Sequence, residues 1–566
     1  MLECVKKKLK IIVESLAVMA LLLVPYLLLG PLEIYSSNKK DFTFAISDFF
    51  GYFLVAAVGC CIVYAVIMLL IPEKVAKILN AVVFSVGVLS YLQCLFMNRQ
   101  LSSVDGGGVD WNAVGAYKYI NLLIWIAGIG IILIGVIKLS KYRDKVVLYG
   151  SAFLIAIQLV AIVSLLLTTK SNSSGVSVQP VGDNRFKLGR EDNIVLFVMD
   201  NLGNVTLDNV IADGNPELID YLHDFTRYTN ADSHFCPTFP SITHMLTGEN
   251  LDYNSESLTW LKNAYDSPKS VAFYDFLKDI GYEREIFMPA SLYVHGDGEN
   301  LRDRFDNVED IRIDINNAWL LRLLAKYSSY RYVPYVLKPY LEVLTSDFNK
   351  AYHIEGERIP DSENSKYYLS LLENGLSISD EFDKAFIFDY IQGVHSPNKT
   401  DAKGNYKENA TLEETTIGCM NIFRHYIDEL EKSGVYDNTT IILTADHGQF
   451  QPVFFMKRAG ERHDKMEINS APISHDDLLP TIVDIIGGDY TEYGTSIFDW
   501  KDGDRRERTY SGRDWMEGYP EVKGGLDANV YKEYIYFTDG EELREKVMND
   551  KYDNIQPATP WDDWVY

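Results

Sequence analysis

The stretch "NIVLFVMD", residues 193–200, decides the fold class of the larger part of this chain. A continuous apolar run with several β-branched residues, ending in an aspartate, is typical of a parallel strand that is buried on both faces. "KAFIFDYI" (384–391) and "TTIILTAD" (439–446) repeat the pattern, and a helical stretch over residues 411–433 lies between them. Alternation of buried strands with helices predicts an α/β domain around a central mixed, mostly parallel sheet.

The first third of the chain is different, because it contains five apolar runs close to the roughly 20 residues that a helix needs to cross a bilayer. Each run is almost free of charge, whereas a buried helix of a soluble protein usually has a polar face. The sequence therefore predicts a five-helix transmembrane domain over residues 1–168, a Ser- and Gly-rich linker over 169–192 and a second domain over 193–566. The predicted spans are residues 9–29, 46–71, 78–96, 120–137 and 146–167.

Basic residues mark one side of these spans. Lysines precede the first span, and further basic clusters lie between the second and third spans (74–77) and between the fourth and fifth (138–145). The loop over 102–116 contains no Lys or Arg, although the loop around 38–41 has two lysines. By the positive-inside rule the three clusters are cytoplasmic, and an odd number of spans places the remainder outside. We therefore expect a multi-pass protein of the plasma membrane with a cytoplasmic N-terminus and an extracytoplasmic C-terminal domain.

Charge divides the chain at the same place. Residues 1–190 carry 18 Lys and Arg against 10 Asp and Glu, whereas the remainder carries 35 against 69, and the whole chain has a net charge of −26. The acidic remainder of the chain lacks the basic surface that nucleic-acid binding requires. Nucleic acid is therefore excluded as a partner. An anionic substrate would have to be held by local cations or by a metal.

The six cysteines form no disulfide framework and no zinc-knuckle spacing. Only Cys236 and Cys419 lie beyond the predicted spans and the N-terminal tail. Either one bridge between them or two unpaired buried thiols is compatible with the sequence.

Metal ligands are predicted at the ends of the buried strands, and a hydroxyl group beside them at the start of a helix. Asp200 ends one strand, and Asp446 and His447 end another, so these side chains are candidates to hold Zn²⁺, Mn²⁺ or Mg²⁺. In "CPTFPSITHMLTG" (236–248), two prolines bracket Thr238, and Ser241 is expected to cap a helix running through residues 244 and 245. A metal beside Thr238 would lower the pKa of its hydroxyl, while backbone N–H groups would receive phosphate oxygens.

Taken together, these stretches resemble the alkaline-phosphatase superfamily. "TFPSITHMLTG" is similar to the nucleophile motif of sulfatases, Cys-x-Pro-Ser-Arg followed by Thr-Gly, and of nucleotide pyrophosphatases, Thr-Phe-Pro-Asn. "NIVLFVMDNLG" and "TTIILTADHG" resemble the metal-binding strands, and "NSAPISHDDLLPTIVDIIGG" resembles the closing helix of sulfatase-type domains. Five spans before such a domain is the layout of lipoteichoic-acid synthases and of membrane phosphoglycerol and phosphoethanolamine transferases. The resemblance covers scattered motifs over residues 193–500.

The resemblance implies a role for each matching residue. Thr238 would be the nucleophile and a ligand of one divalent metal (Mn, Zn or Mg), and His395 in "IQGVHSP" would contact the phosphate or sulfate group. Whether a second metal is bound stays open. His463 would reach one only if its loop folded back, and His475 is expected to support a helix start. The metal ligands implied by the resemblance are Asp200, Thr238, Asp446 and His447.

Two departures from the sulfatase pattern bear on the reaction. Ile242 stands where sulfatases of the oxidised-cysteine type have Arg, and Thr238 replaces the Cys or Ser that becomes formylglycine. Cys236 is out of register with that motif. These departures argue against sulfate-ester hydrolysis by the formylglycine route. In addition, "DHGQFQPVFF" runs almost directly into the next strand, which favours one metal over two.

The expected function is a membrane-anchored, metal-dependent phosphotransferase. It would move phosphoglycerol or phosphoethanolamine from a phospholipid donor, through a phosphothreonine, onto a cell-envelope glycan or polymer. The Tyr-rich segment 251–379 would either cover the site and lead to the membrane or form plain core. Two alternatives remain, a phosphodiesterase or sulfatase-type hydrolase of the same superfamily and a non-catalytic lipid sensor. A transporter is disfavoured because the spans lack buried charges and broken helices.

Overall fold

The chain is described here by a computed structural model, which places its residues in two units. The first unit comprises Met1–Ser177 and Ile311–Gly356, and the second comprises Val178–Asp310 and Glu357–Tyr566. The chain therefore passes between the units three times. The structure describes residues 2–39, 42–98, 111, 115–138, 142–172, 174–253, 255, 257–288, 298–343, 345–354, 358–448, 451–513, 531–537, 543–547 and 555–557.

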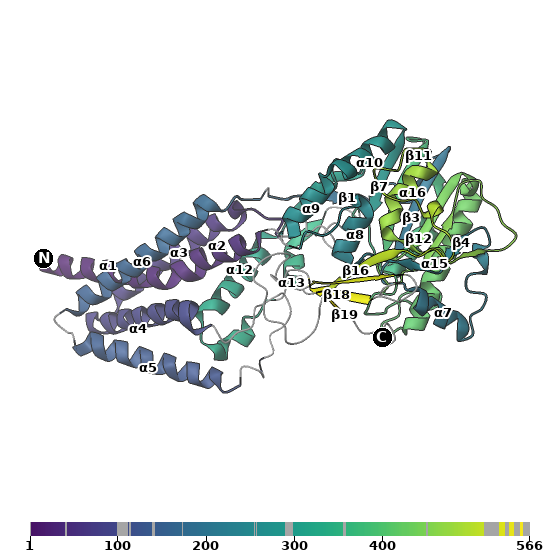
Figure 1. The fold of residues 1–566 in the computed structure, drawn as a ribbon. Coiled ribbons are helices and arrows are strands. Elements are labelled where there is room, and N and C mark those ends of the chain that lie inside the picture. The colour runs from purple at the N-terminus through teal and green to yellow at the C-terminus, as the bar shows by residue number, and fades with distance from the viewer. Residues whose placement is uncertain are drawn as a thin grey trace. The chain divides into compact units, whose positions relative to one another are not determined.

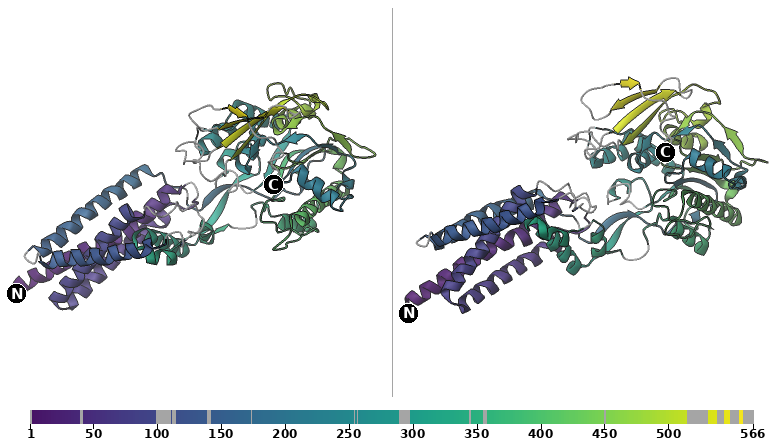
Figure 2. Two further views of the ribbon diagram at one scale, coloured as in Figure 1. Left: turned by 60° about the horizontal axis from the view of Figure 1, so that its bottom comes forward. Right: turned by 90° about the horizontal axis from the view of Figure 1, so that it is seen from below.

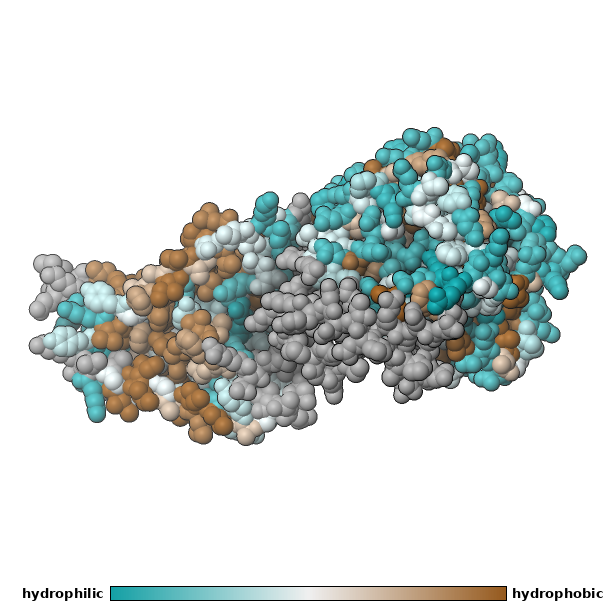
Figure 3. Space-filling model, viewed as in Figure 1, coloured by the Kyte–Doolittle hydropathy of each residue, from teal (hydrophilic) through white to brown (hydrophobic). Residues whose placement is uncertain are grey.

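The first unit contains the five predicted apolar helices, and Figure 3 shows the hydrophobic residues gathered over them. Each is long and apolar enough to cross a membrane, so the predicted five-helix domain is confirmed. Four of the observed spans are longer than predicted because the helices continue into polar residues at their ends, and the second ends one residue earlier than predicted. The observed spans are Lys7–Ser37, Ile46–Leu70, Glu73–Met97, Tyr117–Gly135 and Arg143–Thr168. The helices are α1 (Leu2–Leu23), α2 (Gly30–Ser37), α3 (Phe50–Leu70), α4 (Glu73–Leu92), α5 (Tyr117–Lys138) and α6 (Arg143–Thr168).

Residues 311–356 belong to this unit although they lie far along the chain. Their main element is α12 (Asn317–Tyr332), whose leucines at 320, 323 and 324 share a buried cluster with residues 24–35 at the end of the first span. The Ser328 hydroxyl donates to the Tyr26 carbonyl (2.7 Å), and the Tyr335 N–H donates to Oδ1 of Asn121 (3.0 Å). The contiguous boundaries predicted at residues 168 and 193 stay a prediction, to which the structure adds this returning segment. Its other elements are η7 (Tyr335–Tyr340), α13 (Thr345–Phe348), η8 (Asn349–Ala351), β9 (Tyr352–Ile354) and the end of β8 (Val308–Ile315).

The second unit is built on a seven-stranded sheet in the order β14-β4-β13-β12-β3-β11-β7. Strands β12, β3, β11 and β7 are parallel, and β13 is antiparallel to both of its neighbours. The predicted mixed, mostly parallel sheet is thus confirmed. Its strands are β3 (Asp192–Met199), β4 (Thr226–Tyr228), β7 (Tyr282–Phe287), β11 (Lys384–Ile391), β12 (Thr439–Thr444), β13 (Phe454–Lys457) and β14 (Glu467–Asn469).

Helices cover both faces of this sheet, as Figure 2 shows. Because side chains alternate along a strand, Ile194, Leu196 and Val198 of β3 join one core, and Val195 and Phe197 join the other. The first core contains residues of α8 (Thr238–Thr247), α9 (Ser257–Tyr265), α10 (Pro268–Asp279) and α16 (Leu478–Ile485). The second contains residues of α7 (Asn204–Ala212), α14 (Asn364–Asn374) and α15 (Leu412–Ser433).

Helix α15 shows why the sequence pattern located some elements well. Thr411 caps its first turn and forms a capping box with Glu414, and Gly434 ends it with a φ of 77°. The predicted helix over 411–433 therefore agrees with the structure to within one residue. The strand β11 has the predicted bounds, and β3 and β12 lie within one or two residues of theirs.

A second sheet in this unit has the order β19-β18-β17-β16-β6 (Figure 1). The short strand β6, which directly precedes the nucleophile motif, pairs with Ser511 and Gly512 of β16. Part of the predicted linker is also paired, since Lys187 and Leu188 form β2 beside β10. The remaining strands are β1 (Val176–Pro180), β2 (Lys187–Leu188), β5 (Ala231–Asp232), β6 (Phe235–Cys236), β10 (Ser377–Ile378), β15 (Ile473–Ser474), β16 (Glu507–Arg513), β17 (Tyr531–Phe537), β18 (Leu543–Val547) and β19 (Ile555–Pro557).

Candidate metal centre

Three side chains of metal-ligand type meet at one edge of the central sheet. Asp200 follows β3, and Asp446 and His447 follow β12, the parallel neighbour of β3. Parallel strands bring residues at their carboxyl ends to the same edge. The Nε2 atom of His447 lies 3.5 Å from Oδ1 of Asp200 and 3.6 Å from Oδ2 of Asp446, and all three side chains are buried. The predicted ligands Asp200, Asp446 and His447 thus lie together.

Each carboxylate in this group has one oxygen that is hydrogen-bonded and one that is not. Oδ2 of Asp200 accepts from the Tyr390 hydroxyl (2.5 Å), and Oδ1 of Asp446 accepts from the N–H groups of His447 (2.8 Å) and Asn201 (3.1 Å). Oδ1 of Asp200 and Oδ2 of Asp446 are buried without a hydrogen-bond partner among the described residues. A buried carboxylate oxygen in this state is costly unless a cation binds it. The two oxygens and the imidazole nitrogen lie within 4.8 Å of one another, which fits a divalent metal.

The backbone and the charges are also unusual here. Asn201 has a φ of 61°, in the left-handed region that residues other than glycine rarely adopt and that clusters at functional sites. Burial, and then the charge of Asp446, raises the pKa of Asp200 well above its usual range. Burial alone would lower the pKa of His447, but Asp446, Cys236 and Asp200 together raise it to about 10. A bound metal would take the place of the proton that this imidazole otherwise holds.

Thr238 lies beside the three ligands at the first residue of α8. Its Oγ1 atom is 3.4 Å from Nε2 of His447, and the side chain is half-buried. The N-terminal N–H groups of a helix favour anions, so a phosphate on this hydroxyl would face favourable dipoles. The expectation that Ser241 caps the helix is wrong. Pro237 holds the cap position, and the Ser241 hydroxyl donates to the backbone carbonyl of Asp446 because helix α8 packs directly over the end of β12.

A family model described as "Sulfatase" matches residues 192–488, which are more than half of the chain. The chain belongs to the sulfatase family. The predicted resemblance to the alkaline-phosphatase superfamily is thereby confirmed, and the second unit is a sulfatase-family domain of an enzyme superfamily whose members depend on metals.

Solved structures with similarity to the sulfatase-family chain include three with different described activities. The 4S-sulfatase BT33494S-sulf of Bacteroides thetaiotaomicron is 14% identical, with 66% of this chain and 90% of that chain covered and a TM-score of 0.40. The lipoteichoic acid synthase LtaP of Listeria monocytogenes is 13% identical (69% and 89% covered, TM-score 0.36). The phosphonate monoester hydrolase SpPMH of Silicibacter pomeroyi is 15% identical (63% and 88% covered, TM-score 0.36). No curated protein sequence matches the chain.

The other histidines predicted for the site lie in different surroundings. His395 follows β11 at the same edge of the sheet and is exposed, and no hydrogen bond or ion pair among the described residues joins its imidazole to the three ligands. Its contact with phosphate therefore stays a prediction. His463 lies beside Glu461 (3.2 Å) and Glu467 (3.5 Å). His475 begins the short helix η10 (His475–Asp477), in agreement with its expected role at a helix start.

Two neighbours of the metal centre escaped sequence reasoning. The Cys236 side chain lies beside His447 and contributes to its raised pKa, and the Tyr390 hydroxyl donates to Asp200. Cys236 stands two residues before Thr238 in an extended segment, which is a weak signal that both side chains face the same way. Nothing in the sequence singles out Tyr390. Of the alternatives left open for the thiols, the structure has the unpaired one, since Cys236 and Cys419 are both free and Sγ of Cys419 donates to the Gly393 carbonyl (3.2 Å).

Proposed function

We propose that this sulfatase-family protein is a membrane-anchored phosphotransferase that depends on one divalent metal. It transfers phosphoglycerol or phosphoethanolamine from a phospholipid onto a cell-envelope glycan or polymer outside the cytoplasm. The observation that carries the proposal is the hydroxyl of Thr238 beside two orphaned carboxylate oxygens, at the N-terminus of a helix. Threonine supports attack on phosphorus and cannot become the formylglycine of sulfate-ester hydrolysis.

The proposed reaction has two displacements at phosphorus. Oγ1 of Thr238 forms a bond to the phosphorus of the phospholipid, the bond from phosphorus to the diacylglycerol oxygen breaks, and that oxygen takes up the proton that threonine loses. An acceptor hydroxyl then attacks the phosphothreonine, the bond from phosphorus to Oγ1 breaks, and the proton of the acceptor passes to Oγ1, which regenerates Thr238. A metal held by Asp200, Asp446 and His447 supplies positive charge that lowers the pKa of the hydroxyl and stabilises the phosphoryl oxygens.

The chain's own residues orient these steps. Tyr390 and the N–H groups of Asn201 and His447 fix the two carboxylates by one oxygen each, so that the other oxygens point to the centre. The first N–H groups of α8 receive equatorial phosphate oxygens. His395, on the loop after β11, is the residue that we propose to contact the substrate phosphate.

A lipid donor is supported by the five apolar helices in the same chain. Part of the stretch that matches the family model, residues 311–356, also belongs to the unit that contains these helices. The basic clusters flanking the helices support an extracytoplasmic location for the sulfatase-family domain. Hydrolysis uses the same residues with water as the acceptor, and a lipid sensor would bind the phospholipid without bond cleavage.

The test is mass spectrometry of the full-length protein in lipid nanodiscs. The wild type, Thr238→Ala and Thr238→Ser are incubated with Mn²⁺ and either labelled phosphatidylglycerol or labelled phosphatidylethanolamine, and the peptide containing residue 238 is analysed. We expect an adduct on the wild-type peptide, whose mass identifies the headgroup, and a weaker adduct on Thr238→Ser, which retains a hydroxyl. Thr238→Ala should give none.

The products distinguish a transferase from a hydrolase and from a lipid sensor. Labelled headgroup on added glycan or polymer supports transfer, whereas free glycerol phosphate or ethanolamine phosphate as the only product would show a hydrolase. Lipid binding without diacylglycerol release by the folded, metal-bound wild type would show a sensor. Diacylglycerol release by Thr238→Ala at the wild-type rate would refute the role of the hydroxyl.

A further inference from the structure

A second group of ligand-type side chains lies outside the candidate metal centre. It consists of His234, His244 and Asp476, which come from three separate segments: the turn between β5 and β6, helix α8, and η10. Nδ1 of His234 is 2.7 Å and Nε2 of His244 is 3.2 Å from the same oxygen, Oδ1 of Asp476. The two imidazoles are buried and the carboxylate is about one-third exposed. None of these residues has a part in the proposed transfer.

The hydrogen bond on the far side of His244 fixes which nitrogen faces the group. Its Nδ1 lies 3.2 Å from the backbone carbonyl of Glu249, and a carbonyl only accepts hydrogen bonds, so Nδ1 carries the proton. In the neutral ring Nε2 then presents its lone pair to Oδ1 of Asp476, and apart from this contact the nitrogen is buried without a hydrogen-bond partner among the described residues. A backbone carbonyl on one imidazole nitrogen is the usual support of a histidine that binds metal through the other nitrogen.

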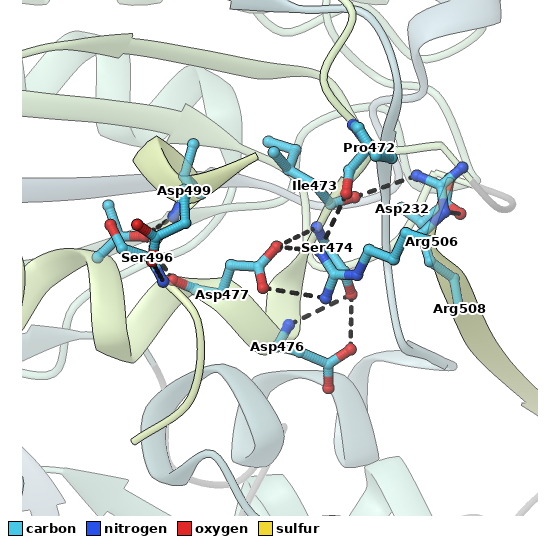
Figure 4. Close-up of polar contacts among 12 residues, drawn as sticks. Asp232, Pro472, Ile473, Ser474, Asp476, Asp477, Ser496, Asp499, Arg506 and Arg508 are labelled. Carbon is cyan, nitrogen blue, oxygen red and sulfur yellow. Dashed lines mark hydrogen bonds and ion pairs between the residues drawn. The ribbon is translucent and has the colours of Figure 1, made fainter. Parts of the chain in front are cut away.

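The carboxylate is supported in a similar way. The Ser474 hydroxyl donates to Oδ2 of Asp476 (2.8 Å), which leaves Oδ1 to the two histidines. The turn that carries Asp476 is itself held, because Asp477 pairs with Arg506 and accepts from the Ser474 N–H (2.9 Å), as Figure 4 shows. Three donor atoms, two of them held by hydrogen bonds on their far sides, therefore lie around one small volume.

The spacing of the donors suits a particular ion. Ligand atoms bonded to tetrahedral zinc at about 2.0–2.2 Å are roughly 3.3 Å from one another. The separation of 3.2 Å is close to this value, whereas the 2.7 Å separation is that of a hydrogen bond and would have to widen by about 0.6 Å around an ion. All three donor atoms lie within 4.8 Å of one another. Two imidazoles with one carboxylate favour Zn²⁺ over Mg²⁺ or Ca²⁺, which prefer oxygen ligands.

We propose that His234, His244 and Asp476 form a second metal site, which binds Zn²⁺ with water as the fourth ligand and is distinct from the centre at Asp200, Asp446 and His447. His244 lies six residues after Thr238 on the same helix, about 9 Å along its axis. The ion would join helix α8 to the turn before it and to the start of η10. It would thereby fix the position of the helix that presents the nucleophile.

The test counts zinc bound to the full-length protein in detergent. Metal-stripped wild type, Asp446→Asn, His244→Ala and the double variant Asp446→Asn/His244→Ala are loaded with Zn²⁺ alone, desalted and measured by inductively coupled plasma mass spectrometry. We expect two zinc ions per wild-type chain, one in each single variant and none in the double variant. His223→Ala, which removes a half-exposed imidazole elsewhere, is the matched control and should retain two.

The decisive comparison is between Asp446→Asn and the double variant, because it does not depend on the first centre or on any lipid. Equal zinc in these two proteins would overturn the proposal, as would zinc that desalting removes from Asp446→Asn. If His244→Ala fails to fold, Asp476→Asn replaces it, since the amide has the shape of the carboxylate without its charge. Zn²⁺ should also raise the melting temperature of Asp446→Asn by several degrees and leave that of the folded double variant unchanged. If the first centre does not bind metal, the wild type will hold one ion and His244→Ala none.

Discussion

Buried carboxylates in the sulfatase-family domain are neutralised in two different ways. Asp389, in the interior of β11, is fully buried, and Oδ1 accepts from Nε (3.0 Å) and Nη2 (2.7 Å) of Arg185 while Oδ2 accepts from the Tyr367 hydroxyl (3.1 Å). Asp200 and Asp446, at the strand ends, each leave one oxygen without a hydrogen-bond partner among the described residues. Arg185 is thus the counter-charge of Asp389, which has a structural role. Asp200 and Asp446 each keep one oxygen available for an external ion.

The largest expected effect is on the activity of the candidate metal centre. Asp446→Asn should lower transfer by about 10⁴-fold, roughly 5.5 kcal/mol of transition-state stabilisation, because the metal ligand set loses a charged oxygen. The measurement is diacylglycerol release per folded protein at saturating Mn²⁺. Asp389→Asn, if it folds, should stay within tenfold of the wild type, and an equal loss in both variants would remove the distinction between the two kinds of carboxylate.

The next effect is on the stability of the domain, through the buried pair of Asp389 and Arg185. Asp389→Asn leaves the buried guanidinium of Arg185 without its counter-charge, and should lower the free energy of unfolding of the domain by about 3–5 kcal/mol. Denaturant unfolding of the full-length protein, followed by fluorescence, checks this value. The pair change Asp389→Asn with Arg185→Gln should recover part of the loss, and no recovery would mean that packing and not charge governs the site.

Asp200→Asn should increase the free energy of unfolding of the metal-free protein, whereas Asp389→Asn should decrease it. Because burial and Asp446 raise the pKa of Asp200, its ionised form destabilises the fold above its ordinary titration range, and an amide removes that penalty while still accepting from Tyr390. We expect a gain of about 1–2 kcal/mol in the free energy of unfolding at pH 8 with chelator present. Added Mn²⁺ should reverse the ranking, since only the wild type binds it well. Destabilisation of the metal-free variant would contradict this account.

The last prediction concerns the pH dependence of the metal-free protein. The pKa of His447 is raised to about 10 in the folded state against about 6.5 in an unfolded chain, so its stabilisation is complete below pH 6.5 and is lost as the pH rises through 10. With chelator present, the melting temperature of the wild type should therefore fall between pH 6.5 and 10 more steeply than that of His447→Gln. With Mn²⁺ bound the imidazole is already deprotonated, and the two slopes should become alike.

The sequence predicted those parts of the molecule that depend on local pattern. The strand predicted over 384–391 and the helix predicted over 411–433 have nearly correct bounds, because a continuous apolar run and the capping residues that the structure shows, Thr411 and Glu414, act within a few residues. Asp200, Asp446 and His447 were predicted together because parallel strand ends must meet at one edge.

Features that depend on distant partners were not predictable in this way. Ser241 was expected to cap α8, but its hydroxyl bonds the Asp446 carbonyl, 205 residues away in sequence. The support of Asp200 by Tyr390 spans 190 residues, and the pair His234 and Asp476 spans 242. Each contact is set by the packing of elements that no short motif relates.

The return of residues 311–356 to the unit of apolar helices has a practical consequence for biochemistry. A protein truncated before Val178, which removes the five apolar helices, would retain α12 but lose the helices on which Leu320, Leu323 and Leu324 are buried. The fragment would then expose the apolar face of α12, and we expect it to aggregate or to bind detergent micelles. A soluble version should replace this internal segment by a short polar loop, and proteolysis near residue 177 alone should leave the cleaved halves associated.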